Sequence, residues 1–129
     1  MPGSAMLKLK KRLGEGWFPP FFFVYLGMVK KTNKSTDETS FHGITIKTTL
    51  GRLRAAFGDP QWESNDGEDK TNIDYNLETP DGDVFTVYDW KNYRPIGEDE
   101  VLDFHIGADS SRIAFQAKNE MHKMGLFVG

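Results

Sequence analysis

The stretch Asn72–Trp90, NIDYNLETPDGDVFTVYDW, decides the fold of this chain. Apolar and polar residues alternate on both sides of the segment Pro80–Gly82, and such alternation is typical of half-buried strands. Proline presets the backbone of the first turn residue, and glycine accepts a positive φ. The stretch therefore predicts a hairpin in which strand 72–79 and strand 83–90 pair through a tight turn.

The same alternation predicts the register of the hairpin. If Thr79 pairs with Asp83, directly opposed residues share a face, and the apolar side chains separate from the polar ones. A slip of one residue would mix the two sets, so the register is strongly specified. Leu77 would then lie opposite Phe85, and Tyr75 opposite Val87. The core face would carry Ile73, Tyr75, Leu77, Phe85 and Val87, and the other face Asn72, Asp74, Asn76, Glu78, Thr86, Tyr88 and Trp90.

Two helices are predicted outside the hairpin. Thr49 can cap a helix over residues 50–57, which Gly58 would end because glycine accepts the left-handed backbone that follows many helices. Asp109 or Ser110 can cap a closing helix. The first helix would bury Leu50, Leu53 and Phe57, and the second, through about Met124, would bury Ile113, Ala114, Ala117, Met121 and Met124.

Two more strands complete the predicted body. Residues 43–48 alternate in polarity, and so do residues 101–106, after which Gly107 is expected to end the strand. The order of elements predicts an α+β fold. We expect a curved antiparallel sheet of about four to five strands with two helices packed on one face, plus an N-terminal hydrophobic strand.

The N-terminal hydrophobic strand is predicted within the apolar run 17–29. Residues 21–29 predict a strand that is apolar on both faces, although Met28 is an alternative start of the natural protein. The run follows a basic stretch, as in a secretory signal, but prolines interrupt it and no small-residue cleavage site follows. It is also shorter than the ~20 residues that span a bilayer as a helix, so we expect no membrane partner.

The chain divides into two parts. Residues 1–5 resemble a cloning remnant and are excluded from the fold. The polar residues 30–40 lack periodicity and are typical of a linker. The predicted organisation is a tag remnant, hydrophobic segment and linker over residues 1–40, followed by a single α+β domain over residues 41–129.

Composition and charge exclude several classes of protein. The chain has 129 residues, enough for about one domain, and a formal net charge of −3. It lacks the basic footprint of a general nucleic-acid-binding protein. It has no cysteine, which excludes disulfide scaffolds, thiol catalysis and thiolate zinc sites and fits a cytoplasmic location. No phosphate-cradling glycine loop is present. We expect no cofactor and no metal.

Three short motifs resemble a known group of proteins. They are Phe41-His42-Gly43-Ile44, Tyr88-Asp89-Trp90-Lys91 and Phe104-His105-Ile106-Gly107. Together they resemble motifs of small uncharacterised proteins of phages and large DNA viruses, over about residues 41–122. The resemblance implies a viral origin, and with it the host cytoplasm, but no particular chemistry.

The pattern Pro80-Asp81 followed by Asp89-Trp90-Lys91 matches that of metal-dependent nucleases only superficially. In such a site two carboxylates hold Mg²⁺ and the lysine positions a water. Asp81 lies in the turn, and Asp89 lies eight residues along the returning strand. At about 3.3 Å per residue the two are roughly 26 Å apart, so one metal ion cannot bridge them.

Six residues are candidates for a binding site. Asp89 and Lys91 share a face with the apolar stripe, so they form either an ion pair that closes the edge of the core or a polar pocket that His42 could join. His105 lies on the outer face beside a carboxylate and could act as a general base, although a lone histidine is more often structural. On that face Tyr88 and Trp90 could stack a nucleobase or pack against another subunit.

These observations lead to two hypotheses of function. The first is a non-enzymatic binding or interaction protein of viral origin, which acts as a small homo-oligomer or binds a host protein. The second is a small enzyme acting on a phosphate-containing ligand with Asp89, Lys91 and a histidine. A small anionic ligand fits the lysine, whereas a nucleic acid is disfavoured by the acidic neighbours of the two rings.

Overall fold

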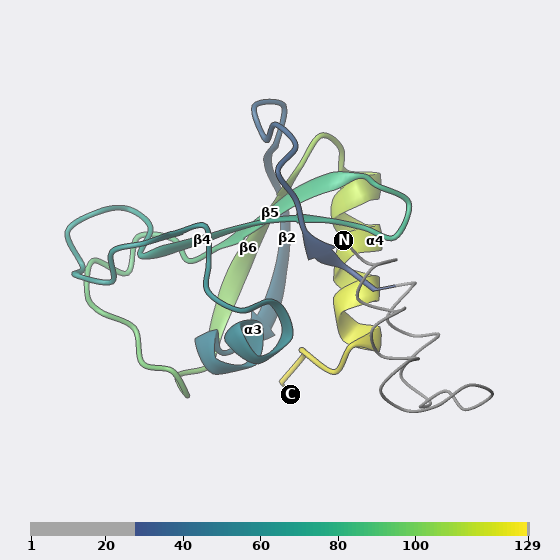
Figure 1. Cartoon of the computed structure of the whole chain (residues 1–129). Helices are drawn as coiled ribbons and strands as arrows, with labels where there is room; N and C mark the ends of the chain where they lie inside the picture. Colours follow the sequence, from purple (N-terminus) through teal and green to yellow (C-terminus); the bar gives the residue numbers. More distant parts are fainter. Residues whose placement is uncertain (1–27, 129) are drawn as a thin grey trace.

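Six antiparallel strands of the described residues form one sheet. Five of them lie side by side in the order β1-β4-β5-β6-β2, and the sixth, β3, pairs with β4. The computed structural model describes residues 28–128 (Figure 1). Two helices within these residues accompany the sheet, which confirms the predicted α+β class. The elements are β1 (Lys30–Lys31), β2 (Ser40–Thr48), α3 (Leu50–Phe57), β3 (Trp62–Glu63), β4 (Ile73–Glu78), β5 (Val84–Tyr88), β6 (Leu102–Ala108) and α4 (Ser111–Lys123).

The β4–β5 hairpin has the predicted register. Leu77 lies opposite Phe85, and Tyr75 lies opposite Val87. The amide of Gly82 donates to the carbonyl of Thr79 at 2.8 Å, and Gly82 has a φ of 87°. The turn thus needs glycine where the sequence has it. The hydroxyl of Thr79 also accepts from the amide of Asp83 at 3.1 Å, so backbone and side chain together close the turn that brings the two strands into pairing.

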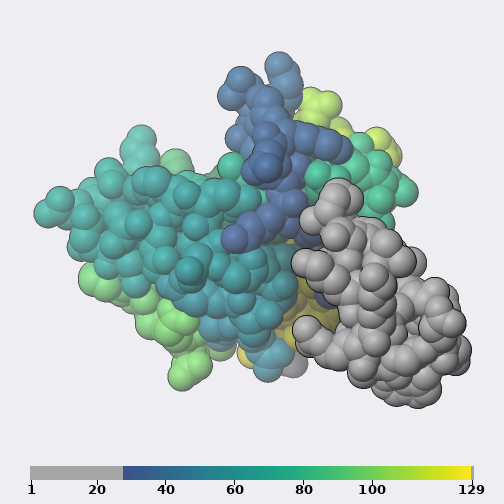
Figure 2. Space-filling view, viewed as in Figure 1, coloured from purple at the N-terminus to yellow at the C-terminus, as the bar shows by residue number. Residues whose placement is uncertain are grey.

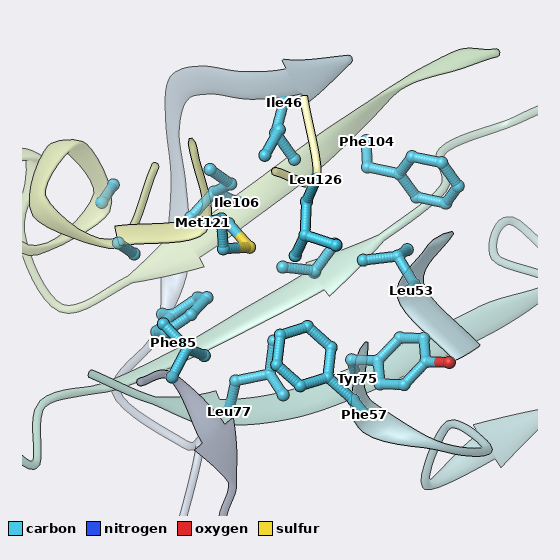
Figure 3. Packing of buried hydrophobic residues seen from close by; sticks show 14 of the residues in the cluster. Ile46, Leu53, Phe57, Tyr75, Leu77, Phe85, Phe104, Ile106, Met121 and Leu126 are labelled. Carbon is cyan, nitrogen blue, oxygen red and sulfur yellow. The ribbon is translucent and has the colours of Figure 1, made fainter. Parts of the chain in front are cut away.

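The core lies between one face of the sheet and the two helices, as the close-up of buried side chains shows (Figure 3). Thr49 caps α3, because its hydroxyl accepts from the amide of Arg52 at 3.1 Å. Of the two predicted caps of α4, Ser110 is the one used. The apolar residues that were predicted to be buried on the two helices are buried, except Met124, which is half-buried. The buried ones are Leu50, Leu53, Phe57, Ile113, Ala114, Ala117 and Met121.

Strand β2 begins at Ser40 rather than at residue 43, and β5 ends at Tyr88 rather than at Trp90. Two further predictions about strand boundaries are wrong. Strand β6 does not end at Gly107 but continues to Ala108, where it pairs with Ser40 of β2. The predicted linker contains Lys30–Lys31, which pairs with β4 as an edge strand. In both places backbone hydrogen bonds form without an alternating side-chain pattern, so periodicity could not reveal them. The sheet has more strands than the four to five predicted, because it includes the two-residue strands β1 and β3.

The predicted strand 21–29 lies mostly outside the described residues. Within them, Val29 is only 3% exposed and belongs to the core cluster. In the space-filling view the first described residues, in blue, lie against the teal surface of the middle of the chain (Figure 2). No helix within residues 28–128 is long and apolar enough to cross a membrane.

Replacing Gly82 by alanine should destabilise the hairpin. A side chain at a φ of 87° is strained, and we expect a loss of about 1–2 kcal/mol in the free energy of unfolding. Urea denaturation followed by circular dichroism measures it. Gly97→Ala is the matched control, because a Cβ at Gly97 meets nothing closer than 3.8 Å. Equal losses for the two variants would contradict the role of Gly82.

Candidate functional site

The face of the sheet opposite the helices carries a cluster of four rings, those of Phe41, Tyr88, Trp90 and His105. Phe41 and His105 stack with centroids 3.9 Å apart. The centroids of Tyr88 and Trp90 lie 5.5 and 6.0 Å from that of His105. The cluster forms because Tyr88 of β5 lies opposite His105 of β6, so their side chains share this face. We call these four residues the ring cluster.

A groove of about 430 Å³ lies beside the ring cluster. Its walls combine aromatic rings with short polar side chains, a composition typical of ligand sites in which a few polar groups orient the ligand. Trp62 and Trp90 are 39% and 41% exposed, so rings that would favour burial still face water. The lining residues are Thr36, Thr39, Ser40, Trp62, Thr71, Asp74, Asn76, Thr86, Tyr88, Trp90 and Gly107.

Asp74 supplies the carboxylate of this groove. It lies on β4 directly opposite Tyr88, and it accepts a hydrogen bond of 3.2 Å from the hydroxyl of Thr71. Burial raises the pKa of the Asp74 carboxyl to about 6; the charge of Asp89 adds to the rise, and the bond from Thr71 opposes it. A half-buried carboxyl with one neutral partner is thus held in the groove.

Strand β3 brings Trp62 to the groove. Trp62 pairs with Asp74 across the strands. The side-chain amide of Gln61 bonds the backbone of Asn76 in both directions, at 2.8 and 2.9 Å. The adjacent Glu63 forms an ion pair with Arg54 of α3. These contacts hold a strand of only two residues in place and so position the Trp62 ring.

Asp89 is a structural residue of the hairpin end. It is 1% exposed, and its carboxylate accepts four hydrogen bonds. The backbone amides of Asn72 and Ile73 donate at 2.6 and 3.1 Å. The side-chain amides of Asn72 and Asn92 donate at 2.8 and 3.1 Å. Because its acceptor sites are occupied from within the chain, Asp89 has little capacity left for a ligand.

The first of the two alternatives for Asp89 and Lys91, an ion pair, is absent from the described part of the chain. Lys91 has a φ of 55°, so the strand alternation that placed both residues on one face ends before it. Its ammonium group instead lies 5.6 Å from the centroid of the Trp90 ring, and that of Lys70 lies 6.0 Å away. The Lys91 side chain therefore lies beside the ring cluster and not at the edge of the core.

The two candidate histidines lie apart from Asp89. The Nε2 atom of His42 lies 2.9 Å from the carbonyl oxygen of Ala108, which pairs with Phe85, four residues before Asp89 on the neighbouring strand. His42 therefore does not join a pocket at Asp89. His105 is in the ring cluster, where burial lowers the pKa of its imidazole. The neutral ring stacks well but is a poor cation.

The structure brings together four of the six predicted site residues: Tyr88, Trp90, Lys91 and His105. It adds three that the sequence did not single out, namely Phe41, Trp62 and Asp74. Asp74 could have been found, because the predicted register already placed it on the same face as Tyr88. Trp62 could not, since no alternation marks the short strand that carries it.

Comparisons with known proteins found no matching family model, no matching curated protein and no matching solved structure. The geometry of the groove and of the ring cluster is therefore the basis for the function proposed below.

Removal of the Asp89 carboxylate should destabilise the protein strongly. Asp89→Ala leaves four donors without their partner, and we expect a loss of about 3 kcal/mol or more in the free energy of unfolding. Asp89→Asn keeps one acceptor oxygen and should cost about 1–3 kcal/mol. Urea denaturation measures both. Asp103→Ala, at an exposed position of β6, is the control and should change stability by less than about 0.5 kcal/mol.

The raised pKa of Asp74 predicts a pH dependence of stability. Between about pH 4 and about pH 6 the folded state keeps a proton that the unfolded state has released, so the free energy of unfolding falls as pH rises. Asp74→Asn should remove this fall and be more stable than the wild type above about pH 6, by about 1 kcal/mol after discounting for water at the half-buried carboxyl. Denaturation at several pH values measures it.

Asp103→Asn, which changes an exposed carboxylate of the same sheet, is the control for the pH series. A difference between wild type and Asp74→Asn that stays constant across the interval would show that the Asp74 carboxyl titrates normally.

Proposed function

We propose that this chain is a non-enzymatic binding protein and that the groove beside the ring cluster binds its ligand. The observation that carries the proposal is the accumulation of exposed rings around a groove on the face of the sheet opposite α3 and α4. Exposed aromatic surface of this kind is costly in water and is typical of recognition sites.

The groove is better suited to binding than to catalysis. Its one titratable carboxyl, Asp74, lies two strands away from His105, at roughly 10 Å across the sheet, with Tyr88 between them. An acid and a base at that distance do not share a proton. The enzyme hypothesis also relied on Asp89, whose oxygens are occupied by hydrogen bonds within the hairpin end.

A second groove lies on the outer side of α4 and is larger, about 750 Å³. Its lining residues within the described part of the chain all belong to α4, with Phe115 60% exposed, and include none of the predicted site residues. The groove beside the ring cluster gathers side chains from several strands and loops, and polar groups that converge from several elements are typical of ligand sites. We therefore place ligand binding on the sheet and use Phe115 as a control position.

Three narrower expectations stay predictions. They are the viral origin implied by the resemblance, a location in the host cytoplasm, and self-association into a small oligomer. The ring cluster is compatible with the last of these, because exposed aromatic faces also pack against a second copy of a chain.

Trp90→Ala should abolish or weaken ligand binding by about tenfold or more, since stacking on one ring contributes about 1–3 kcal/mol. A library of cationic, neutral and anionic fragments can be screened by two-dimensional amide NMR on the wild-type protein. We expect the shifted amides to cluster around Tyr88, Trp90 and His105. The matched control, Phe115→Ala, should bind the same fragments with unchanged affinity.

Fragments that shift only the amides of α4, or that bind the Trp90→Ala variant as well as the wild type, would contradict the proposed site. A screen in which no fragment of any class shifts the ring cluster would also count against it.

A further inference from the structure

The groove beside the ring cluster has a single charged wall. Asp74 is the one charged side chain among its eleven lining residues. None of the six ion pairs found in the described residues includes it. Its hydrogen-bond partner, Thr71, is neutral. The groove thus presents a negative charge, partly shielded from water, that forms no ion pair within the described residues, although Lys70 lines an adjoining hollow together with Asp74.

The rings of the groove favour the same sign of ligand charge. The faces of Trp62, Tyr88 and Trp90 are electron-rich and attract cations by their quadrupoles. Trp90 displays this property within the chain itself, because the ammonium groups of Lys91 and Lys70 lie 5.6 and 6.0 Å from its centroid. Rings and a carboxylate together are the usual composition of sites for alkylated ammonium groups.

We propose that the ligand of this groove is a small organic cation that carries an alkylated ammonium group. The inference rests on the proposed binding function and gives the ligand its chemical class. Asp74 would neutralise the charge, and the rings would contact the alkyl substituents. The volume of about 430 Å³ exceeds the needs of the ammonium group alone and lies within the range of small-molecule sites.

The hydroxyl-bearing residues of the groove would hold the polar remainder of such a ligand. Thr36, Thr39 and Ser40 come from the loop before β2 and its first residue, and Thr86 comes from β5. The hydroxyl of Thr39 already donates to the carbonyl of Thr36 at 2.7 Å, so it can only accept from a ligand. A hydroxyl whose proton is free both donates and accepts, so together these residues accommodate alcohol groups without adding charge. They provide orientation, while the charge of Asp74 selects a cation.

An anionic ligand fits this groove poorly. Asp74 would repel it, and the buried carboxylate of Asp89 is close enough to raise the pKa of Asp74 by its charge. Lys91 and Lys70 are exposed, so water and salt screen their attraction for an anion. These lysines act instead as internal competitors for the Trp90 ring. Their removal should therefore strengthen cation binding.

The test compares choline with 3,3-dimethyl-1-butanol, its neutral carbon isostere, by NMR titration of the full chain. We expect choline to bind at the ring cluster about tenfold more tightly or better than the isostere, because only the cation interacts with the Asp74 charge and the ring quadrupoles. Asp74→Asn, which keeps an oxygen for Thr71, should weaken this preference clearly, and the remainder would come from the rings. Lys91→Met should strengthen choline binding about twofold or more.

Equal affinity for choline and its isostere would overturn the cation inference, and so would choline binding that Asp74→Asn leaves unchanged. Loss of choline binding in Lys91→Met would also overturn the cation inference. If inorganic phosphate or a neutral sugar shifts the ring cluster while choline does not, the ligand class is wrong but the proposed binding function stands. If no probe shifts the ring cluster, both proposals fail. Thermal melting confirms that each variant is folded.

Discussion

The four hydrogen bonds of the Asp89 carboxylate hold together the end of the sheet on which the groove depends. Asn72 gives two of them, and it also bonds the amide of Gly67 and the carbonyl of Arg94, both at 3.0 Å. One buried carboxylate and one buried amide thereby connect β4, the end of β5 and the two loops that lie side by side at this end (Figure 1). These loops carry Thr71, Lys70, Trp90 and Lys91.

This arrangement explains why a charge lies where the apolar stripe of the hairpin ends. A buried carboxylate is tolerated when hydrogen bonds satisfy it, and here backbone and side-chain amides do so, with no ion pair to Asp89 among residues 28–128. The consequence reaches the groove, because the uncompensated charge of Asp89 raises the proton affinity of Asp74 on the opposite face. Two carboxyls of one hairpin thus serve different roles, and burial and hydrogen bonding determine which role each has.

Much of the fold follows from local pattern, and part of the site does not. Alternation alone predicted that Leu77 lies opposite Phe85, and the cap of α3 at Thr49 follows from the residue type. The alternative of an ion pair between Asp89 and Lys91 was wrong because strand parity was extended past Tyr88, where β5 ends, to Lys91, which has a positive φ. Trp62 was not predicted as a site residue because its short strand has no alternation of apolar and polar residues. Tertiary contacts hold that strand in place.

A direct titration of Asp74 tests the central claim, that this groove holds an uncompensated carboxyl suited to a cation. Carbon-13 NMR of the side-chain carboxyls yields the pKa of Asp74 with and without saturating tetramethylammonium chloride, with sodium chloride as the salt control. The account predicts a pKa of about 6 in the free protein and a lower value with tetramethylammonium only. A pKa near the ordinary value of about 4, or one that both salts lower equally, would contradict it.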